Sequence, residues 1–226
     1  MKKIGLIAAM SGELNALLES MGEVTPLPAP NGKRVLYAKQ GDKEIYLAES
    51  GIGEIYSTMA AQHLITAYGV EAIINFGVCG SLKKKHTLKK TVILSSVVHY
   101  EMDTSDLDGV EVGRYAHLPS VYIPLDKSLI EKAQAFDPTI ETAICASGNK
   151  FVTKESDKRY LTEQYDADVC EMESAGIALT CMANNVPCLL IKAISDGEGG
   201  AEEFRAVVDE ASRVYISLVK MLMQSL

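Results

Sequence analysis

Short apolar runs alternate along the chain with segments whose apolar residues recur at helical spacing. Ile4–Ala9 and Ala72–Phe76 are continuously apolar, which is typical of strands buried on both faces. The same patterns predict further strands at Arg34–Gln40, Glu44–Ser50, Thr91–Val98 and Thr142–Ala146, the first two joined as a hairpin, and helices at Ser11–Met21, Ile55–Tyr68, Leu125–Phe136, Lys154–Gln164 and Glu202–Leu226. This alternation of strands and helices predicts an α/β protein.

The segment Cys170–Gly200 is the richest in chemistry, and its pattern predicts strand, turn, helix, strand and loop. Glu171 and Glu173 fall at the first strand end and Asp196 at the second. Carboxylates are costly beside buried strands unless water or a binding site surrounds them, and ligands of open α/β sheets gather at the carboxyl ends of strands. Glu171 and Glu173 lie two residues apart, so we expect them on one strand face.

Four other features, taken alone, fit an ordinary structural explanation as well as a functional one. Gly51-Ile-Gly53 and Gly77-Val-Cys-Gly80 are predicted tight turns, whose N–H groups suit a ligand, but neither matches a nucleotide-binding motif. Glu13 is typical of an exposed residue in the first turn of a helix. Phe151 suits either the core or an aromatic lid over a flat ligand.

Composition narrows the class of protein. The 226 residues, read as a single domain over 1–226, are 47% hydrophobic, which suffices for a buried core. The formal net charge of −8 argues against nucleic acid or an anionic membrane as a partner. No apolar run reaches membrane-spanning length and the N-terminus has no signal-peptide pattern, so we expect a cytoplasmic protein.

The cysteines and histidines give little sign of a metal or redox site. Five cysteines without CxxC spacing fit buried thiols in a reducing compartment, and Cys79 suits a tight turn better than a nucleophile. A metal site at His99, Asp103 and Asp106 is an alternative that we set aside, and no metal or cofactor is predicted. The basic cluster Lys83–His86 is expected in a solvated turn.

Several motifs in order along the chain resemble the nucleoside phosphorylase/hydrolase superfamily, and most closely its 5′-methylthioadenosine/S-adenosylhomocysteine nucleosidases. They are GLIAAMSGEL at Gly5–Leu14, ESGIG at Glu49–Gly53, INFGVCGSL at Ile74–Leu82, SGNKFV at Ser147–Val152, CEMESAGIA at Cys170–Ala178 and KAISD at Lys192–Asp196. The resemblance implies a three-layer α/β/α domain with a central mixed sheet.

The resemblance also implies roles for residues near the sugar. Glu13 matches the carboxylate that orients and deprotonates the attacking water, and Glu173 matches the acid that binds the ribose hydroxyls. Met172 matches the residue under the sugar, while Met10 and Ile52 match residues near the ribose and its 5′ substituent.

For the purine, the resemblance makes Asp196 the acid that protonates N7, with Ser195 in support. Phe151 matches the aromatic residue stacked on the base, and the main chain of Val152 matches the groups that bind the purine edge. Glu171 and Val78 complete the predicted binding site. Cleavage of an N-glycosidic bond places positive charge on the ribose and negative charge on the leaving purine, so carboxylates near the sugar and an acid near the base suit this chemistry.

Water is favoured over phosphate as the nucleophile. Phosphorylases of the superfamily hold phosphate with an Arg and a Ser, where this chain has Asn75 and Val78, and the Glu13 carboxylate would repel an anion. The leading prediction is hydrolysis of methylthioadenosine, S-adenosylhomocysteine or a relative such as deoxyadenosine or a futalosine-type nucleoside. A phosphate-dependent purine nucleoside phosphorylase and a non-catalytic nucleoside-binding protein are the alternatives.

Two departures from the family pattern concern the substrate. Nucleosidases usually have Ser or Thr at the position of Val78, and the loop Gly197–Gly200 is too short to supply the usual aromatic wall of the 5′ pocket, which leaves Phe204 as a substitute. Lys150 is unusual in a base-binding loop and is expected to point outward. The resemblance implies a homodimer whose segment Tyr100–Pro119, with Leu118-Pro119 as pocket wall, closes the partner's 5′ pocket.

Overall fold

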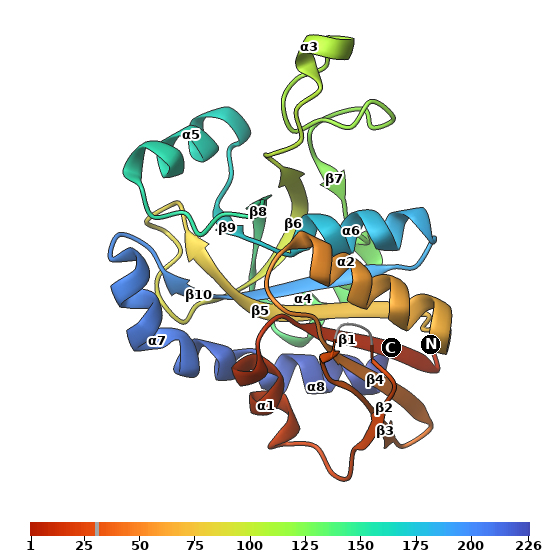
Figure 1. Cartoon of the computed structure of the whole chain (residues 1–226). Helices are drawn as coiled ribbons and strands as arrows, with labels where there is room; N and C mark the ends of the chain where they lie inside the picture. Colours follow the sequence, from red (N-terminus) through yellow and green to blue (C-terminus); the bar gives the residue numbers. More distant parts are fainter. Residues whose placement is uncertain (30–31) are drawn as a thin grey trace.

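A mixed β-sheet runs through the centre of the computed structural model, which describes residues 1–29 and 32–226 (Figure 1). Parallel and antiparallel pairings occur in the same sheet, as predicted. Its strands are β1 (Lys3–Ala8), β2 (Thr25–Leu27), β3 (Val35–Gln40), β4 (Lys43–Glu49), β5 (Ala72–Ser81), β6 (Thr91–His99), β7 (Ile123–Pro124), β8 (Glu141–Ser147), β9 (Val169–Glu171) and β10 (Cys188–Asp196).

Helices cover both faces of the sheet, which confirms the three-layer α/β/α prediction. Figure 1 shows α2 and α6 on one face, and α1, α7 and α8 on the other. The helices are α1 (Ser11–Leu18), α2 (Glu54–His63) with its π-helical extension η2 (Leu64–Tyr68), α3 (Ser105–Asp108), α4 (Lys127–Phe136), α5 (Glu155–Tyr165), α6 (Ser174–Ala183), α7 (Gly200–Val214) and α8 (Ile216–Ser225).

Strand β5 organises the sheet because it pairs with β1, β9 and β10. The pairs β10–β6, β6–β8 and β8–β9 then close a circuit of five strands that begins and ends at β5. Strands β1, β5 and β10 are mutually parallel, so their carboxyl ends lie at one edge of the sheet. The segments that follow them, which carry the predicted site, are brought together there.

The apolar runs become the core because helices cover the strands on both faces. Ile4, Leu6 and Ile7 of β1 and Ile73 and Ile74 of β5 have no exposed surface. Burial of such side chains is worth about 1.5–3 kcal/mol each, so these strands anchor the scaffold beneath the site. The continuous apolar pattern is therefore a reliable guide to strands buried on both faces.

The prediction of a tight turn at Gly77–Gly80 is wrong. Strand β5 continues through these residues to Ser81, paired with β10 from Ile73↔Cys188 to Gly80↔Asp196. The glycines are needed for space rather than for a turn, since a Cβ atom at Gly77 would lie 2.8 Å from Glu13 Oε1. At the other predicted turn, Gly51 and Gly53 do have positive φ angles of 90° and 100°.

The predicted long C-terminal helix is two helices, α7 and α8, separated at Tyr215. The Tyr215 side chain is fully buried and packs against Phe76 of β5, with 5.6 Å between ring centroids. Helix α1 ends at Leu18 rather than Met21, and the short helix α3 forms in a segment for which no helix was predicted. Periodicity misses such breaks because tertiary packing decides them.

Two local predictions also need correction. Strand β9 ends at Glu171 and Glu173 is the N-cap of α6, so the two acids do not share a strand face. The Lys83–His86 segment is only partly solvated, because His86 is 3% exposed and Lys83 and Lys85 bind the Asp168 carboxylate at 3.1 and 2.9 Å. None of the helices in the described ranges has the length and apolarity needed to span a bilayer.

Candidate active site

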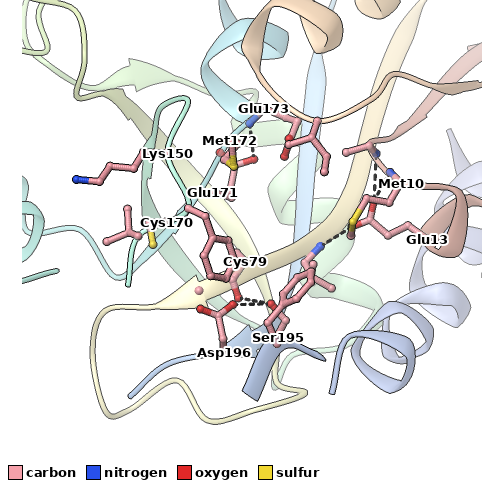
Figure 2. Close-up of a pocket in the computed structure, with 17 residues that line it drawn as sticks. Met10, Glu13, Cys79, Lys150, Cys170, Glu171, Met172, Glu173, Ser195 and Asp196 are labelled. Atoms are coloured by element: carbon pink, nitrogen blue, oxygen red, sulfur yellow. Dashed lines mark hydrogen bonds between the residues drawn. The ribbon is translucent and has the colours of Figure 1, made fainter. Parts of the chain in front are cut away.

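One cavity of about 90 Å³ lies at the sheet edge where β1, β5, β9 and β10 end (Figure 2). Every residue that the sequence places in the site lines this cavity, although the roles remain predictions. The lining residues are Ala9, Met10, Glu13, Ile52, Val78, Cys79, Gly80, Lys150, Phe151, Val152, Cys170, Glu171, Met172, Glu173, Ser195, Asp196 and Phe204.

Glu13 is buried in the first turn of α1, against the expectation for an isolated first-turn acid. Its carboxylate accepts hydrogen bonds from the backbone N–H groups of Ala9, Met10 and Val78 at 3.1, 2.9 and 2.9 Å. Burial raises the pKa of Glu13, and these N–H groups oppose that rise. The result is a carboxyl group fixed in direction at the floor of the cavity, with a basicity above that of a solvated glutamate.

Glu171 belongs to a buried ion pair that the sequence reasoning did not predict. Its Oε2 atom lies 2.9 Å from Lys192 Nζ, and both side chains are almost fully buried. Burial pushes the pKa of Glu171 upward, but the Lys192 ammonium holds it below the usual value. The carboxylate also accepts the N–H groups of Glu173 and Ser174 at the start of α6. Glu171 therefore lines the cavity with a carboxylate already bound to protein donors.

Glu173 is the acid that contacts the start of α2. Its Oε1 atom accepts the N–H of Gly53 at 2.8 Å, where the positive φ of Gly53 turns the chain into α2. Burial, followed by repulsion from Glu171, raises the pKa of Glu173 to about 7. Its neutral and ionised forms are therefore close in free energy near neutral pH, which suits a group that responds to charge developing on a ligand.

Asp196 ends β10 at the opposite side of the cavity from Glu13 (Figure 2). Its Oδ1 atom accepts the hydroxyl of Ser195 at 2.8 Å, and Gly80 leaves room for Oδ2, since a Cβ there would lie 3.0 Å away. Burial raises the pKa of Asp196, and the Ser195 hydrogen bond opposes that rise. Asp196 is consequently placed to hold a proton more firmly than an exposed aspartate.

An aromatic pair forms the outer wall of the cavity. Phe151 is 42% exposed, so it belongs to a lid rather than to the core, and its ring meets Phe204 edge-on at 5.5 Å. Phe204 therefore does line the cavity, in the first turns of α7. The Lys150 ammonium points away from the cavity, as expected, and pairs with Asp157 (Figure 2).

The structure gives little support to a cysteine nucleophile at Cys79 or to a metal site at His99. Cys79 is buried, and burial raises the pKa of its thiol well above the usual value, which disfavours a thiolate nucleophile. His99 lies 3.0 Å from Glu54 and near Glu101, not with Asp103 and Asp106 as in the alternative we set aside.

Lys192 is the functional candidate that sequence reasoning missed. A lysine within the apolar run Leu189–Ile194 is the available signal, because an ammonium in a buried strand requires a carboxylate partner. The pattern does not say which acid that partner is. The register of β10 against β5 and the end of β9 decide that it is Glu171.

The chain has a mixed sheet with a cavity lined by carboxyl groups at the ends of its strands. This arrangement is typical of α/β proteins that bind a small polar molecule at the carboxyl ends of their strands. Residues 3–223 match the sequence profile described as the phosphorylase superfamily. The chain therefore belongs to the phosphorylase superfamily.

Relatives of two different names are similar to this chain. The chain is 31% identical to the aminodeoxyfutalosine nucleosidase of Campylobacter jejuni, with 90% of each chain covered. It is 32% identical to the 5′-methylthioadenosine/S-adenosylhomocysteine nucleosidase of Shewanella pealeana, with 86% of each covered. A solved structure of the Helicobacter pylori enzyme of the latter name superposes with a TM-score of 0.94 at 27% identity, covering 100% of this chain and 99% of that one.

Proposed function

We propose that the protein hydrolyses the N-glycosidic bond of adenine nucleosides that carry a 5′ substituent, releasing adenine. The carboxyl groups of Glu13, Glu173 and Asp196 around one cavity support this proposal. In such a cleavage the sugar becomes cationic while the base becomes anionic. Carboxylates on one side and a protonated carboxyl on the other stabilise both charges. Two groups of relatives whose names say nucleosidase support the same reaction type.

Each acid has an environment suited to a distinct step. Glu13, held by three N–H donors, orients a water molecule and accepts its proton as the water attacks the sugar. Glu173 binds the ribose hydroxyls and, when ionised, stabilises the positive charge of the sugar. Asp196, with a raised pKa, donates its proton to N7 of the leaving purine. Phe151 stacks on the base, and the Phe204 ring supports it.

The observation that carries hydrolysis rather than phosphorolysis is the hydrogen bond from the Val78 N–H to the Glu13 carboxylate at 2.9 Å. That N–H would be a natural donor to a phosphate ion, and here a carboxylate occupies it. Asn75, the other departure from the phosphorylases, is buried with its amide donating to the Ile7 carbonyl at 3.0 Å. The ammonium groups of Lys150, which lines the cavity, and of Lys192 are paired with acids.

The substrates that we propose are methylthioadenosine, S-adenosylhomocysteine and futalosine-type nucleosides. The names of the relatives cover both substrate groups. The apolar residues Met10, Ile52 and Phe204 line the cavity and suit a thioether or an aromatic 5′ substituent. We place the reaction in the cytoplasm, in methionine salvage, and five free, buried thiols fit such a reducing compartment.

The test is incubation of each nucleoside with the protein, with and without phosphate, and separation of products by chromatography. We expect adenine and a free sugar at equal rates in both conditions. A sugar 1-phosphate formed only with phosphate would support a phosphorylase instead. Binding of the nucleoside without any release of base would support a non-catalytic nucleoside-binding protein.

We also propose that the protein acts as a homodimer. Ile52, Ile55, Tyr56 and Met59 lie beside the cavity and expose 55, 73, 45 and 40% of their surface. Such an apolar patch is expected to be covered by another protein surface, and the segment Tyr100–Pro119 of a second copy is the candidate. Light scattering should show a dimer for the wild type and a monomer for Ile55→Asp. Val214→Asp, at an exposed residue of α7 outside this patch, is the control and should remain a dimer. A monomeric wild type would contradict the proposal.

A further inference from the structure

Two oppositely charged side chains hold the short segment Gly197–Gly199, which joins Asp196 to helix α7. The ammonium of Lys158, on α5, donates a hydrogen bond to the Gly197 carbonyl. The carboxylate of Glu203, in the first turn of α7, accepts the N–H groups of Gly197 at 2.8 Å and Gly199 at 3.1 Å. Both polar backbone groups of the residue after Asp196 are therefore held by charged side chains.

The arrangement is built into the packing rather than lying loosely on the surface. Lys158 is 7% exposed although its partner is a carbonyl group rather than a carboxylate. Burial of an ammonium in this way is costly unless it also interacts with other charges. Gly199 permits the Glu203 side chain to fold over the segment, since a Cβ atom there would lie 3.0 Å from two of its carbon atoms.

Asp196 lies between the active-site cavity and a second, larger one. The second cavity has a volume of about 710 Å³, and Lys158, Asp196, Gly197 and Glu203 all line it. Lys158 and Glu203 thus face the side of Asp196 that is turned away from the proposed substrate. From there they can act on the Asp196 carboxyl without touching the substrate.

We propose that Lys158 and Glu203 are positioning residues that fix the segment behind Asp196 and, through their opposite charges, set the pH range over which Asp196 keeps its proton. The proposal rests on the proposed function, in which Asp196 is the general acid.

The electrostatics agree with the geometry. Burial raises the pKa of Asp196; the Ser195 hydrogen bond and then the Lys158 ammonium lower it, and the Glu203 carboxylate raises it. The thiols of Cys79 on β5 and Cys170 on β9 also interact with Asp196. The second cavity is further lined by the titratable side chains of Lys83, Lys84, His86, Glu155, Arg159, Glu163 and Glu198. Burial raises the pKa of Cys170 to about 12 and that of Cys79 well above its usual value, so both thiols stay neutral at working pH. Lys158 and Glu203 are the charged side chains that shift the pKa of Asp196.

The two charges should shift the pH profile of activity in opposite directions. A general acid must be protonated, so activity declines as the pH rises through the pKa of Asp196. Loss of the Lys158 charge removes an interaction that favours the ionised form, so the alkaline limb of the pH profile should move to higher pH. Loss of the Glu203 charge should move it to lower pH. A shift of about one pH unit in each direction is expected for a charge at close range.

The experiment is the pH profile of kcat/KM for Lys158→Met and Glu203→Gln with methylthioadenosine. Lys158→Arg should restore the wild-type limb. Lys84→Met and Glu198→Gln are matched controls, because Lys84 and Glu198 line the same cavity as an exposed ion pair at 3.2 Å and their loss should leave the limb in place. The proposal would be overturned if the alkaline limb of the pH profile stays in place in Lys158→Met and Glu203→Gln, or moves in the same direction in both. A lower kcat alone would not support it.

A second measurement covers variants that fold poorly and separates this proposal from the proposed function. The Asp196 carboxyl can be titrated by ¹³C NMR, with its signal assigned by loss in Asp196→Asn, in the wild type, in Glu203→Gln and in the milder variant Lys158→Gln. Opposite displacements in Lys158→Gln and Glu203→Gln support the pair, and an unchanged titration refutes it. If the wild type releases no base, the proposed function is wrong. The NMR titration still tests whether Lys158 and Glu203 shift the pKa of Asp196.

Discussion

At the scale of single residues, the acids of the cavity differ in the groups that surround them. Glu13 has three N–H donors, Glu171 has a buried lysine, Glu173 has one N–H and an acidic neighbour, and Asp196 has one hydroxyl. These environments move the pKa values in different directions, and only Glu171 is held below its usual value. Separation of pKa values by environment is how one site provides both an acid and a base.

Asp196→Asn should lower kcat by about 10²–10⁴-fold, the usual cost of losing general acid assistance. The amide keeps the shape of the side chain but has no acidic proton to give. Steady-state kinetics beside the circular dichroism spectrum would measure both activity and fold. Asp42→Asn, at an exposed turn, is the control and should keep full activity. Turnover near that of the wild type in folded Asp196→Asn would exclude the role.

Glu13→Gln and Glu173→Gln should both be severely impaired but should differ in binding. Glu173→Gln loses the carboxylate proposed to bind the ribose hydroxyls, so a substrate analogue should bind weakly. Glu13→Gln loses the base for water, so the analogue should still bind while turnover fails. Calorimetry with a non-hydrolysable nucleoside separates the two variants, and an equal loss of affinity in both would contradict the assignment.

At the scale of elements, the site depends on where strands and helices end. Strand β5 extends to Ser81, so the Val78 N–H reaches Glu13, and the short segment after β10 lets α7 begin at Gly200. The early start of α7 places Phe204 against Phe151 at the cavity wall. We propose that this one aromatic residue on a helix substitutes for the aromatic wall that the resemblance to the nucleosidases led us to expect from a longer loop.

We expect this shorter wall to tolerate varied 5′ substituents, including the homocysteine group. An apolar contact on the scale of a methylene discriminates by about 1–3 kcal/mol, so kcat/KM for methylthioadenosine should exceed that for S-adenosylhomocysteine by less than about a thousandfold. Phe204→Ala should raise KM for both, by about tenfold or more, whereas Phe136→Ala on α4, 41% exposed, should change neither. A larger preference in the wild type would mean that other residues, such as Leu118-Pro119 of a second copy, close the pocket.

At the scale of the whole molecule, the buried acids should affect stability as well as chemistry. The pKa of Glu173 rises from 4.5 to about 7, so the native state retains a proton that the unfolded state has lost in this range. The contribution of Glu173 to stability must then fall as the pH rises from about 4.5 to about 7, by linkage. Glu13 and Asp196, whose pKa values are also raised, contribute in the same direction.

Urea unfolding between pH 5 and 8 checks this expectation. The free energy of unfolding of the wild type should decrease across the range, and Glu173→Gln should show a shallower decrease because its amide does not titrate. A single transition is also expected if residues 1–226 form one domain, as we propose. An identical pH slope in the variant would show that Glu173 titrates as it does in water, and two separate transitions would contradict the single domain.

The amino-acid sequence by itself determined the α/β class, most of the strands and helices, and most of the residues that line the cavity. Apolar periodicity is a local property, so Ile4–Ala9 and Ala72–Phe76 are recognisable as buried strands without any coordinates. The motifs are local as well, since Glu13, Phe151, Glu173 and Asp196 each stand in a short segment with its own pattern.

Only the tertiary structure decided how those segments face one another. The pairing of β5 with β10 turns Gly77–Gly80 into a strand, and the burial of Tyr215 divides the last helix. The same packing selects Glu171 as the partner of Lys192 and places Lys158 and Glu203 behind Asp196. These contacts join residues far apart in the chain, and their free energy depends on burial and distance, which no local pattern of residue types contains.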